Sequence, residues 1–253
     1  MKSLHKALDI LETFLDVGSG EIRLSEIAKI TGIHKATVNR IASVFVTRGY
    51  LNQLERRGKY SLGVGFLKFS SIIKHKMKIT DMAMPHLIEL NKLVKESVAL
   101  FGCTDEKIYF IEEVHSKYPL RLNPEPDHTL PLHCTGVGKI FLATLTMQEL
   151  EKYFKNSDIK AFTPNTITEF DQLKKHLMKV AREGVAYDNE EWYLGVRTVA
   201  AGIRDSEEKL VGCIDVTGPT VRLTPEMQNE MAPYVKQYAM KISMDLGYRD
   251  NSL

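Results

Sequence analysis

Three short groups of residues in this 253-residue chain have side chains that could take part in catalysis. The run 136–139, Gly-Val-Gly-Lys, resembles the end of a phosphate-binding loop. The full pattern needs another glycine five positions before Gly138 and a Ser or Thr directly after the lysine, so that backbone N–H groups and a hydroxyl meet the phosphates and Mg²⁺. His133 and Ile140 stand at those positions. The sequence therefore does not support a nucleotide-binding loop.

The other two groups are adjacent pairs. Cys134 as a nucleophile with His133 as its base is excluded, because adjacent residues rarely aim their side chains at one point. Glu190 and Glu191 could form an acid/base pair, but consecutive acidic residues more often lie in a solvated turn. No G-x-S-x-G motif occurs, and the eight histidines lack metal-ligand spacing. The sequence therefore predicts a protein that is not an enzyme and that binds neither a cofactor nor a metal. The alternative function is that of a hydrolase-like α+β enzyme.

Residues 34–48 indicate binding rather than catalysis. Apolar residues repeat at helical spacing, so the opposite face of the helix points to solvent. That face is cationic and amide-bearing, and such side chains read guanine and adenine in the major groove of DNA. The residues predicted to contact DNA from this helix are His34, Lys35, Thr37, Asn39, Arg40 and Ser43. For an isolated helix a merely solvated face is the alternative, so the neighbouring elements decide.

Residues 49–63 contain two short strand-like runs around a basic turn. A β-hairpin tip with Arg56, Arg57 and Lys59 beside a recognition helix can straddle the phosphate backbone of DNA. Such contacts supply affinity that is independent of sequence and sensitive to salt. The hairpin is therefore predicted to be a wing.

Two further helices are predicted before the recognition helix. Residues 4–15 have the i, i+3, i+4, i+7 pattern of a packed helix. The leucines expected to share its packed face are Leu4, Leu8, Leu11 and Leu15. Residues 24–33 form a short helix that ends where Gly32 can adopt positive φ. Helix, helix-turn-helix and basic hairpin in this order predict a winged helix-turn-helix domain.

The net charge of +2 conceals an asymmetry along the chain. Residues 1–78 contain 14 Lys/Arg and 6 Asp/Glu, a net charge of +8. Residues 79–253 contain 20 and 26, a net charge of −6. This division predicts a polyanion-binding segment joined to a domain with another function.

The overall composition is that of a folded protein. With 43% hydrophobic and 26% charged residues, the chain is neither disordered, collagen-like nor coiled-coil. No run approaches the roughly 18 apolar residues of a membrane helix, and the N-terminus lacks the apolar core of a signal peptide, so a cytoplasmic location is expected. Cys103, Cys134 and Cys213 are expected to be reduced thiols rather than disulfide or zinc ligands.

The remaining two thirds have mixed periodicity. Residues 66–79 are amphipathic and basic and predict a single linker helix, either a rigid transmitter between domains or an ordinary surface helix; a further helix through Lys95 would be capped by Thr80 or Asp81. Strands are predicted at 97–103, 107–114, 199–203 and 210–216, and helices at 147–155, 169–183 and 225–246. The tight turn at Asp105-Glu106 favours antiparallel pairing, so this part is predicted to be an α+β domain.

Short motifs in both parts of the chain share an order and an approximate spacing with one family. In the N-terminal part they are Ser25-Glu26-Ile27-Ala28, Thr31-Gly32-Ile33, Thr37-Val38-Asn39-Arg40, Gly49-Tyr50-Leu51 and Tyr60-Ser61-Leu62-Gly63. In the remainder they are Leu130-Pro131-Leu132-His133-Cys134-Thr135-Gly136-Val137-Gly138-Lys139, Thr163-Pro164-Asn165-Thr166-Ile167, Gly184-Val185-Ala186-Tyr187-Asp188-Asn189-Glu190-Glu191, Gly195-Val196, Thr217-Gly218-Pro219 and Arg222-Leu223. Over nearly the whole chain these motifs resemble the IclR family of bacterial transcriptional regulators.

This resemblance implies a domain organisation and a function. It implies a winged helix-turn-helix domain over residues 1–65, a linker helix over 66–79 and a GAF-like α+β effector-binding domain over 80–253. It also implies a ligand-responsive regulator that binds double-stranded operator DNA as a dimer or tetramer. Such a regulator would control a catabolic operon in response to a small organic acid or an aromatic metabolite.

The resemblance also implies which residues meet the effector. In the family the effector lies over the sheet, enclosed by the loop before the Gly-x-Gly-Lys helix and by the strands after the Glu-Glu pair. The matching positions here are Leu122, Gly136, Val137, Asp188, Val196, Thr198, Asp215 and Thr217. Backbone N–H groups near a helix start, at Gly136 and Val137, can hold a carboxylate, so the effector is expected to carry one. Asp188 could instead support a turn, and Thr217 could serve strand packing.

Asp215 departs from the family, in which small uncharged residues such as serine are common at this position. A carboxylate among apolar neighbours must be paired or solvated. One hypothesis is that Asp215 recognises a hydroxyl or amine of the effector, and another is that it pairs with Arg197. Arg197 could alternatively grip an effector carboxylate or lie at the surface. Trp192 and Tyr193 could form an aromatic lid or pack at an interface.

Overall fold

The computed structural model describes residues 2–15, 20–53, 58–69, 78–104, 108–122 and 130–249. The chain divides into two compact units, an N-terminal unit of residues 1–77 and a C-terminal unit of residues 78–253. Residues 65–69 are helical, but most of the predicted linker helix lies outside the described residues.

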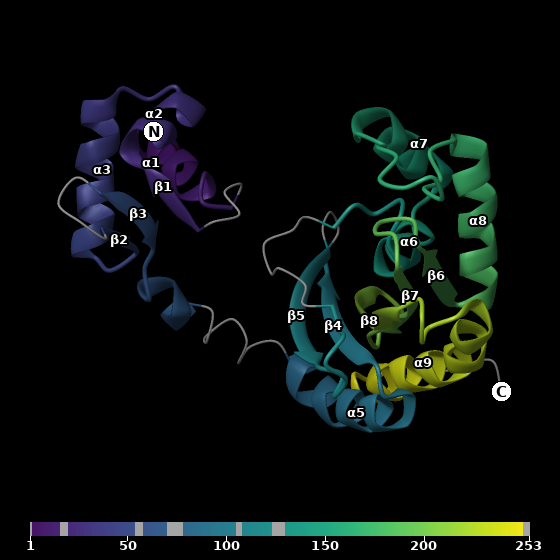
Figure 1. Ribbon diagram of the computed structural model, residues 1–253. Coiled ribbons are helices and arrows are strands. Elements are labelled where there is room, and N and C mark those ends of the chain that lie inside the picture. The colour runs from purple at the N-terminus through teal and green to yellow at the C-terminus, as the bar shows by residue number, and fades with distance from the viewer. Residues whose placement is uncertain are drawn as a thin grey trace. The chain divides into compact units, whose positions relative to one another are not determined.

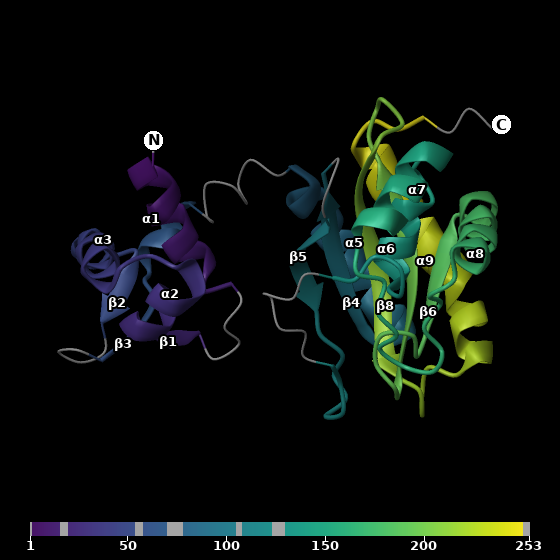
Figure 2. The ribbon, with the colours of Figure 1, turned by 90° about the horizontal axis from the view of Figure 1, so that it is seen from above.

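Ahead of the helical residues 65–69, the described part of the N-terminal unit forms three helices and a small antiparallel sheet (Figures 1 and 2). The helices are α1 (Lys2–Glu12), α2 (Leu24–Thr31) and α3 (Lys35–Thr47). The strands are β1 (Glu21–Arg23), β2 (Leu51–Gln53) and β3 (Lys59–Leu62), in the order β1-β3-β2. Gly32 follows α2 with φ +66°, the left-handed conformation predicted for it. The order of helix, helix-turn-helix and hairpin is confirmed, with β1 as an additional strand.

The prediction for the packed face of α1 was wrong. Leu4, Leu8 and Leu15 are 67%, 47% and 58% exposed, whereas Ile10 and Phe14 are buried in the core of the unit. This segment carries apolar residues around most of its circumference, so periodicity alone could not show which face meets α2 and α3. The structure therefore leaves a row of leucines in contact with solvent.

The C-terminal unit is an α+β domain around one five-stranded antiparallel sheet. Its strands are β4 (Ser97–Cys103), β5 (Ile108–Val114), β6 (Val185–Asn189), β7 (Val196–Arg204) and β8 (Leu210–Pro219), in the order β5-β4-β8-β7-β6. Its helices are α5 (Lys78–Val94), α6 (Gly136–Leu142), α7 (Met147–Asn156), α8 (Phe170–Glu183) and α9 (Pro225–Asp245). The predicted strands and helices are present, and β6 was not predicted. Thr80 and Asp81 lie inside α5 rather than capping it, because the helix begins at Lys78.

The two faces of this sheet are covered by different helices. Figure 1 shows α5 and α9 side by side across one face and α6 on the other, with α8 along the β6 edge. Ala99, Ala200 and Cys213 point to the side of α6 and pack in one cluster with Val137 and Ile140. The next residue along each strand points to the opposite face. This alternation decides which polar side chains can lie together under α6.

Candidate DNA-binding helix and effector site

Helix α3 presents the polar face that its periodicity predicted. Val38 and Ala42 are fully buried, whereas Lys35, Asn39, Arg40 and Ser43 are exposed.

The start of α3 is held by a local contact. His34 is the N-cap residue, and its Nδ1 accepts a hydrogen bond from Ala36 N at 3.4 Å. His34 is exposed, but Thr37 is half-buried, so it offers less of its surface than its predicted role assumes. A helix with one buried stripe and an exposed row of cationic and amide groups can lie in a major groove.

The predicted wing is described only in part. Arg56 and Arg57 lie outside the described residues. Lys59 opens β3, is exposed, and places Nζ 3.3 Å from Glu21 Oε2 on β1. An exposed ion pair of this kind is weak, so Lys59 can exchange Glu21 for a phosphate at little cost.

Five of the predicted effector residues lie on the face of the sheet that α6 covers. The strand register aligns Asp188, Thr198, Thr217 and Ser97 in one row across β6, β7, β8 and β4. The next row contains Ala186, Ala200, Asp215, Ala99 and Glu113, which lies on β5. Val196 is on the same face as Thr198, two residues earlier. Glu113 was not predicted at this site, because its place opposite Ala99 depends on a strand register that local periodicity does not specify.

Asp215 is buried and only partly satisfied. The residue is 6% exposed, and Oδ2 accepts a hydrogen bond from Thr217 Oγ1 at 3.2 Å. Its Oδ1 has no hydrogen-bond partner among the described residues. The hypothesis that Asp215 pairs with Arg197 was wrong. Arg197 directly precedes Thr198 on β7, so its side chain points to the other face of the sheet. There its Nη2 lies 3.0 Å from Glu190 Oε2.

Asp188 has a structural role in the observed fold. It is 2% exposed, and its Oδ1 accepts a hydrogen bond from Glu191 N at 2.7 Å, which closes the turn after β6. Gln228 of α9 donates to the carbonyls of Asp188 and Thr198. The alternative that Asp188 supports a turn therefore agrees with the structure, and its side chain still faces the α6 side of the sheet.

Gly136 and Val137 begin α6, directly over the sheet. A Cβ at Gly136 would lie 2.7 Å from Thr198 Oγ1 and 3.1 Å from Ala200 Cβ, so only glycine permits this approach. Thr135 caps the helix by accepting a hydrogen bond from Gly138 N. The predicted lining residues of α6, β7 and β8 are thus neighbours.

Leu122 is half-buried at the end of a segment that follows β5. Arg222 holds this segment: it forms two hydrogen bonds with the carboxylate of Glu96, donates to Leu120 O at 2.8 Å, and stacks 4.4 Å from the ring centroid of Tyr118. Bidentate pairing and stacking are properties of arginine that lysine lacks. Arg222 belongs to one of the motifs shared with the family, but its contacts with Glu96, Tyr118 and Leu120 were not predicted.

Lys139 is used for structure and not for phosphate binding. Its side chain is fully buried, and its ammonium donates to Tyr187 O and forms an ion pair with Glu191. The expectation that Glu190 and Glu191 form a solvated turn was wrong, since Glu191 is 3% exposed and Glu190 pairs with Arg197. A lysine distant in sequence offsets the cost of burying Glu191.

Cys134 and His133 are also unsuited to catalysis. Burial raises the pKa of the Cys134 thiol to about 12, which disfavours the nucleophilic thiolate. The Nε2 of His133 hydrogen-bonds to Lys160 O at 2.9 Å. All three cysteines are free thiols. Among the described residues, no group of three His, Cys, Asp or Glu side chains could hold a metal ion. None of the described helices combines the length with the apolar composition that a membrane span requires.

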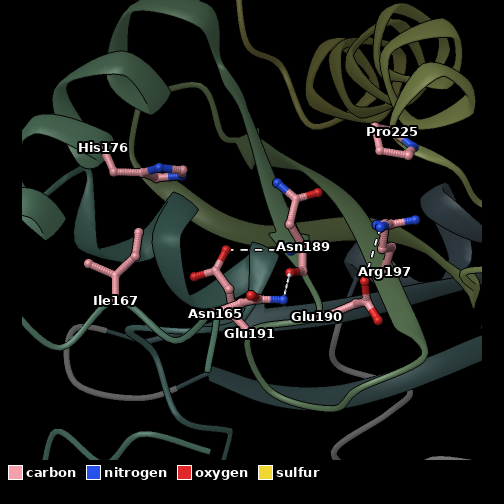
Figure 3. Close-up of a pocket in the computed structure, with 8 residues that line it drawn as sticks. All are labelled: Asn165, Ile167, His176, Asn189, Glu190, Glu191, Arg197 and Pro225. Carbon is pink, nitrogen blue, oxygen red and sulfur yellow. Dashed lines mark hydrogen bonds and ion pairs between the residues drawn. The ribbon is translucent and has the colours of Figure 1, made fainter. Parts of the chain in front are cut away.

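A pocket of about 500 Å³ lies at the far end of β6 and β7, outside the predicted effector lining. It is lined by Asn165, Ile167, His176, Asn189, Glu190, Glu191, Arg197 and Pro225. Figure 3 shows Arg197 directed at Glu190, near the start of α9, with His176 and Ile167 across the pocket. Trp192 and Tyr193 stack on each other, with ring centroids 4.6 Å apart. Arg197 is therefore an ion-pair partner within this separate pocket.

The buried carboxyls predict an unusual dependence of stability on pH. Burial raises the pKa of Asp215, and that of Asp188, to about 7; the neighbouring carboxylate of Glu113 acts on Asp215 in the same direction. An acid whose pKa is higher in the folded state binds its proton more tightly when the protein is folded. Its ionisation therefore lowers the free energy of unfolding as pH rises from about 4 to about 7.

Asp215→Asn is therefore expected to gain stability over the native chain as pH increases. The gain at pH 8 should exceed that at pH 5 by about 2 kcal/mol, given about 1.4 kcal/mol per pKa unit. Urea unfolding followed by circular dichroism at both pH values measures the difference. Asp158→Asn, at an exposed carboxylate, is the control and should follow the native profile. A gain for Asp215→Asn that is independent of pH would contradict the assignment.

Comparison with known proteins agrees with this geometry. The family described as "Bacterial transcriptional regulator IclR C-terminal" matches residues 72–244, and the "IclR helix-turn-helix domain" matches residues 3–55. The transcriptional repressor IclR of Escherichia coli strain K12 is 27% identical over 253 residues, with 98% of this chain and 90% of that protein covered.

Solved structures share the fold over nearly the whole chain. The crystal structure of Thermotoga maritima IclR has a TM-score of 0.74 at 28% identity and covers 98% of this chain and 100% of that one. An IclR homolog from Microbacterium hydrocarbonoxydans, crystallised with 4-hydroxybenzoate, has a TM-score of 0.82 at 20% identity and covers 97% and 99%. Matched by both family domains, the chain belongs to the IclR family of bacterial transcriptional regulators, which are DNA-binding proteins and not enzymes.

Proposed function

We propose that this regulator controls a catabolic operon in the cytoplasm, binding operator DNA through α3 and sensing a small metabolite over the α6 face of the sheet. The observation that carries the proposal is the division of polar groups. An exposed cationic and amide row lies on α3, whereas the C-terminal unit buries unpartnered polar atoms of Asp215 and Thr198 under α6. The first suits DNA and the second suits a small ligand.

The class of effector is proposed from the same site and from the fold. The IclR homolog crystallised with 4-hydroxybenzoate shows that a protein of this fold can hold an aromatic acid. In this chain the proposed lining comprises Leu122, Gly136, Val137, Asp188, Val196, Thr198, Asp215 and Thr217. Leu122 and Val196 supply apolar walls, and a carboxylate of the effector would meet the backbone at Gly136 and Val137.

The regulator function is tested by selecting bound fragments from random-sequence DNA with the full-length protein. We expect a recurrent sequence to emerge, and binding to it to weaken steeply as salt concentration rises. Adding organic and aromatic acids to this complex, one at a time, should then change the affinity for the selected DNA. Failure to enrich any sequence at low salt would contradict the proposed function.

Exposed leucines on α1 and just after it support association of two copies. Leu4, Leu8 and Leu15 form an apolar row that solvent covers in a single chain, and a recurring apolar patch on a folded surface commonly marks an interface. We propose a homodimer or a dimer of dimers, because one winged helix reads too few base pairs for a specific site.

Leu8→Glu is expected to shift the protein towards monomer and to weaken binding to the selected DNA at least about tenfold, because it places a charge in the proposed interface. Sedimentation velocity measures the association state, and the exposed Val64→Glu is the control. If Leu8→Glu remains as associated as the control variant, the row has no part in the interface.

A further inference from the structure

The sheet face under α6 carries three carboxyls with little access to solvent, and we call them the acidic floor: Asp215, Glu113 and Asp188. Asp215 and Asp188 are 6% and 2% exposed, and the Glu113 side chain is 6% exposed. Asp215 and Glu113 lie in one row across the sheet, separated by Ala99. Asp188 lies in the neighbouring row. Carboxyls that share one buried face of a sheet raise the cost of ionising one another, and both Glu113 and Asp188 act on Asp215 in this way.

Two buried polar atoms on this face of the sheet lack a hydrogen-bond partner. Asp215 Oδ1 and Thr198 Oγ1 have no hydrogen-bond partner among the described residues, and both residues are more than nine-tenths buried. Thr198 pairs across the sheet with Thr217, whose hydroxyl already donates to the other oxygen of Asp215. A buried carboxylate oxygen without a donor costs free energy that a bound donor would recover. The vacant acceptor therefore points to a ligand that donates hydrogen bonds.

The nearby cations of the C-terminal unit are engaged elsewhere. Arg197 pairs with Glu190 on the opposite face of the sheet. Lys139 is paired with Glu191. His115 Nδ1 lies 3.2 Å from Glu113 Oε1, but its side chain is 48% exposed, so that pair is open to water. Within the described part of the chain, no lysine or arginine forms an ion pair with Asp215, so a bound cation would be its ion-pair partner.

We propose that the effector of this regulator carries a protonated amine, which donates to Asp215 Oδ1 and to the Thr198 hydroxyl above the acidic floor. The inference rests on the proposed function, since it names the chemical class of that regulator's effector. An ammonium group supplies both donors and positive charge. A hydroxyl supplies a donor but leaves the carboxyls uncompensated, and a carboxylate at this position would be repelled. A carboxylate elsewhere on the same molecule is compatible with the floor.

Titration of the floor is consistent with this choice. Burial raises the pKa of Asp215 to about 7; the carboxylates of Glu113 and Asp188 add to this effect, and hydrogen bonding from Thr217 and the Ala99 backbone opposes it. A cation bound at Oδ1 would favour the ionised form and lower this pKa again.

The test uses two matched series of probes with the full-length protein. One series is 4-(aminomethyl)benzoate, 4-(hydroxymethyl)benzoate and 4-methylbenzoate, and the other is 4-aminobutanoate, 4-hydroxybutanoate and butanoate. Thermal shift and isothermal titration calorimetry report binding to the native state. Both are done at about pH 7.5, where an amine with a pKa near that of lysine, roughly 10.4, is protonated. In at least one series the amine should bind at least about tenfold more tightly than its hydroxyl analogue.

Two variants of Asp215 and one control locate the effect. Asp215→Asn and Asp215→Ser should each remove the preference for the amine over the hydroxyl analogue. Glu112→Gln is the matched control, because Glu112 neighbours Glu113 on β5 but pairs with Leu100 in the adjacent row and faces the other side of the sheet. It should retain the preference. Circular dichroism checks that each variant is folded. If the serine variant is unfolded, the asparagine variant still tests the proposal, because asparagine has nearly the same shape as aspartate.

Three outcomes would overturn the inference: no amine in either series binds, the hydroxyl or unsubstituted analogues bind as tightly, or Asp215→Asn keeps the amine preference. These measurements need no DNA. Loss of sequence-selective DNA binding would therefore contradict the proposed function while leaving the amine titration readable. An absent amine preference with DNA binding intact would contradict only the class of effector.

Discussion

Glu191→Leu is expected to lower the free energy of unfolding of the effector domain by about 3–5 kcal/mol, the range for breaking a buried ion pair from one side. The reason is the full burial of Lys139, whose ammonium would be left with Tyr187 O as its remaining partner of the two it now has. Urea unfolding of the full chain at pH 7.5, followed by circular dichroism, measures the loss.

Two further variants separate the ion pair from general damage to the turn. Glu190→Leu removes the neighbouring acid, whose pair with Arg197 is 22% and 16% exposed, and should cost clearly less. The double variant Lys139→Met/Glu191→Leu should recover much of the loss, because replacing both partners of a buried pair with apolar groups is often tolerated. If Glu191→Leu costs no more than Glu190→Leu, the buried pair does not stabilise this turn.

Arg40→Ala is expected to reduce affinity for the selected operator by about 10- to 100-fold, while binding to random DNA falls far less. This difference follows from assigning Arg40, on the exposed face of α3, to base edges, where one bidentate contact discriminates by about 1–3 kcal/mol. Fluorescence anisotropy on both DNAs, repeated over a range of salt concentrations, measures the two losses.

Arg57→Ala is the informative comparison, because the wing is proposed to contact phosphates. Its affinity should fall by a similar factor on every sequence, and the slope of log affinity against log salt should decrease by about one unit. Equal losses on selected and random DNA for Arg40→Ala would instead place that arginine on the phosphate backbone.

The sequence predicted those features that local spacing encodes. The two faces of residues 34–48 differ in polarity, so the exposed row of α3 could be assigned before any fold was known. The apolar neighbours of Asp215 indicated that its carboxylate needs a partner or solvent, but not that one of its oxygens is buried without either. By contrast, residues 4–15 carry leucines, Ile10 and Phe14 around most of the helix, and only the position of α2 and α3 decides which of them are buried.

Features that depend on distant pairing could not be predicted. Nothing beside Glu191 shows that its counter-charge, Lys139, stands 52 positions earlier. Arg197 and Asp215 are near in sequence, but strand register and alternation send them to opposite faces of the sheet. Glu113 joins Asp215 because Ala99 pairs with both of their strands. In each case tertiary structure, and not local pattern, assigns the partner.

At the proposed effector site, the clamp at Arg222 would slow ligand exchange. This one side chain joins the start of β4, through Glu96, to Tyr118 and Leu120 just before the predicted wall residue Leu122. Opening that wall would require a bidentate ion pair and a stacked ring to separate together. A substitution of Arg222 would thus change the rate at which an effector leaves more than it changes the contacts between effector and site. The duration of each regulatory signal would change with that rate.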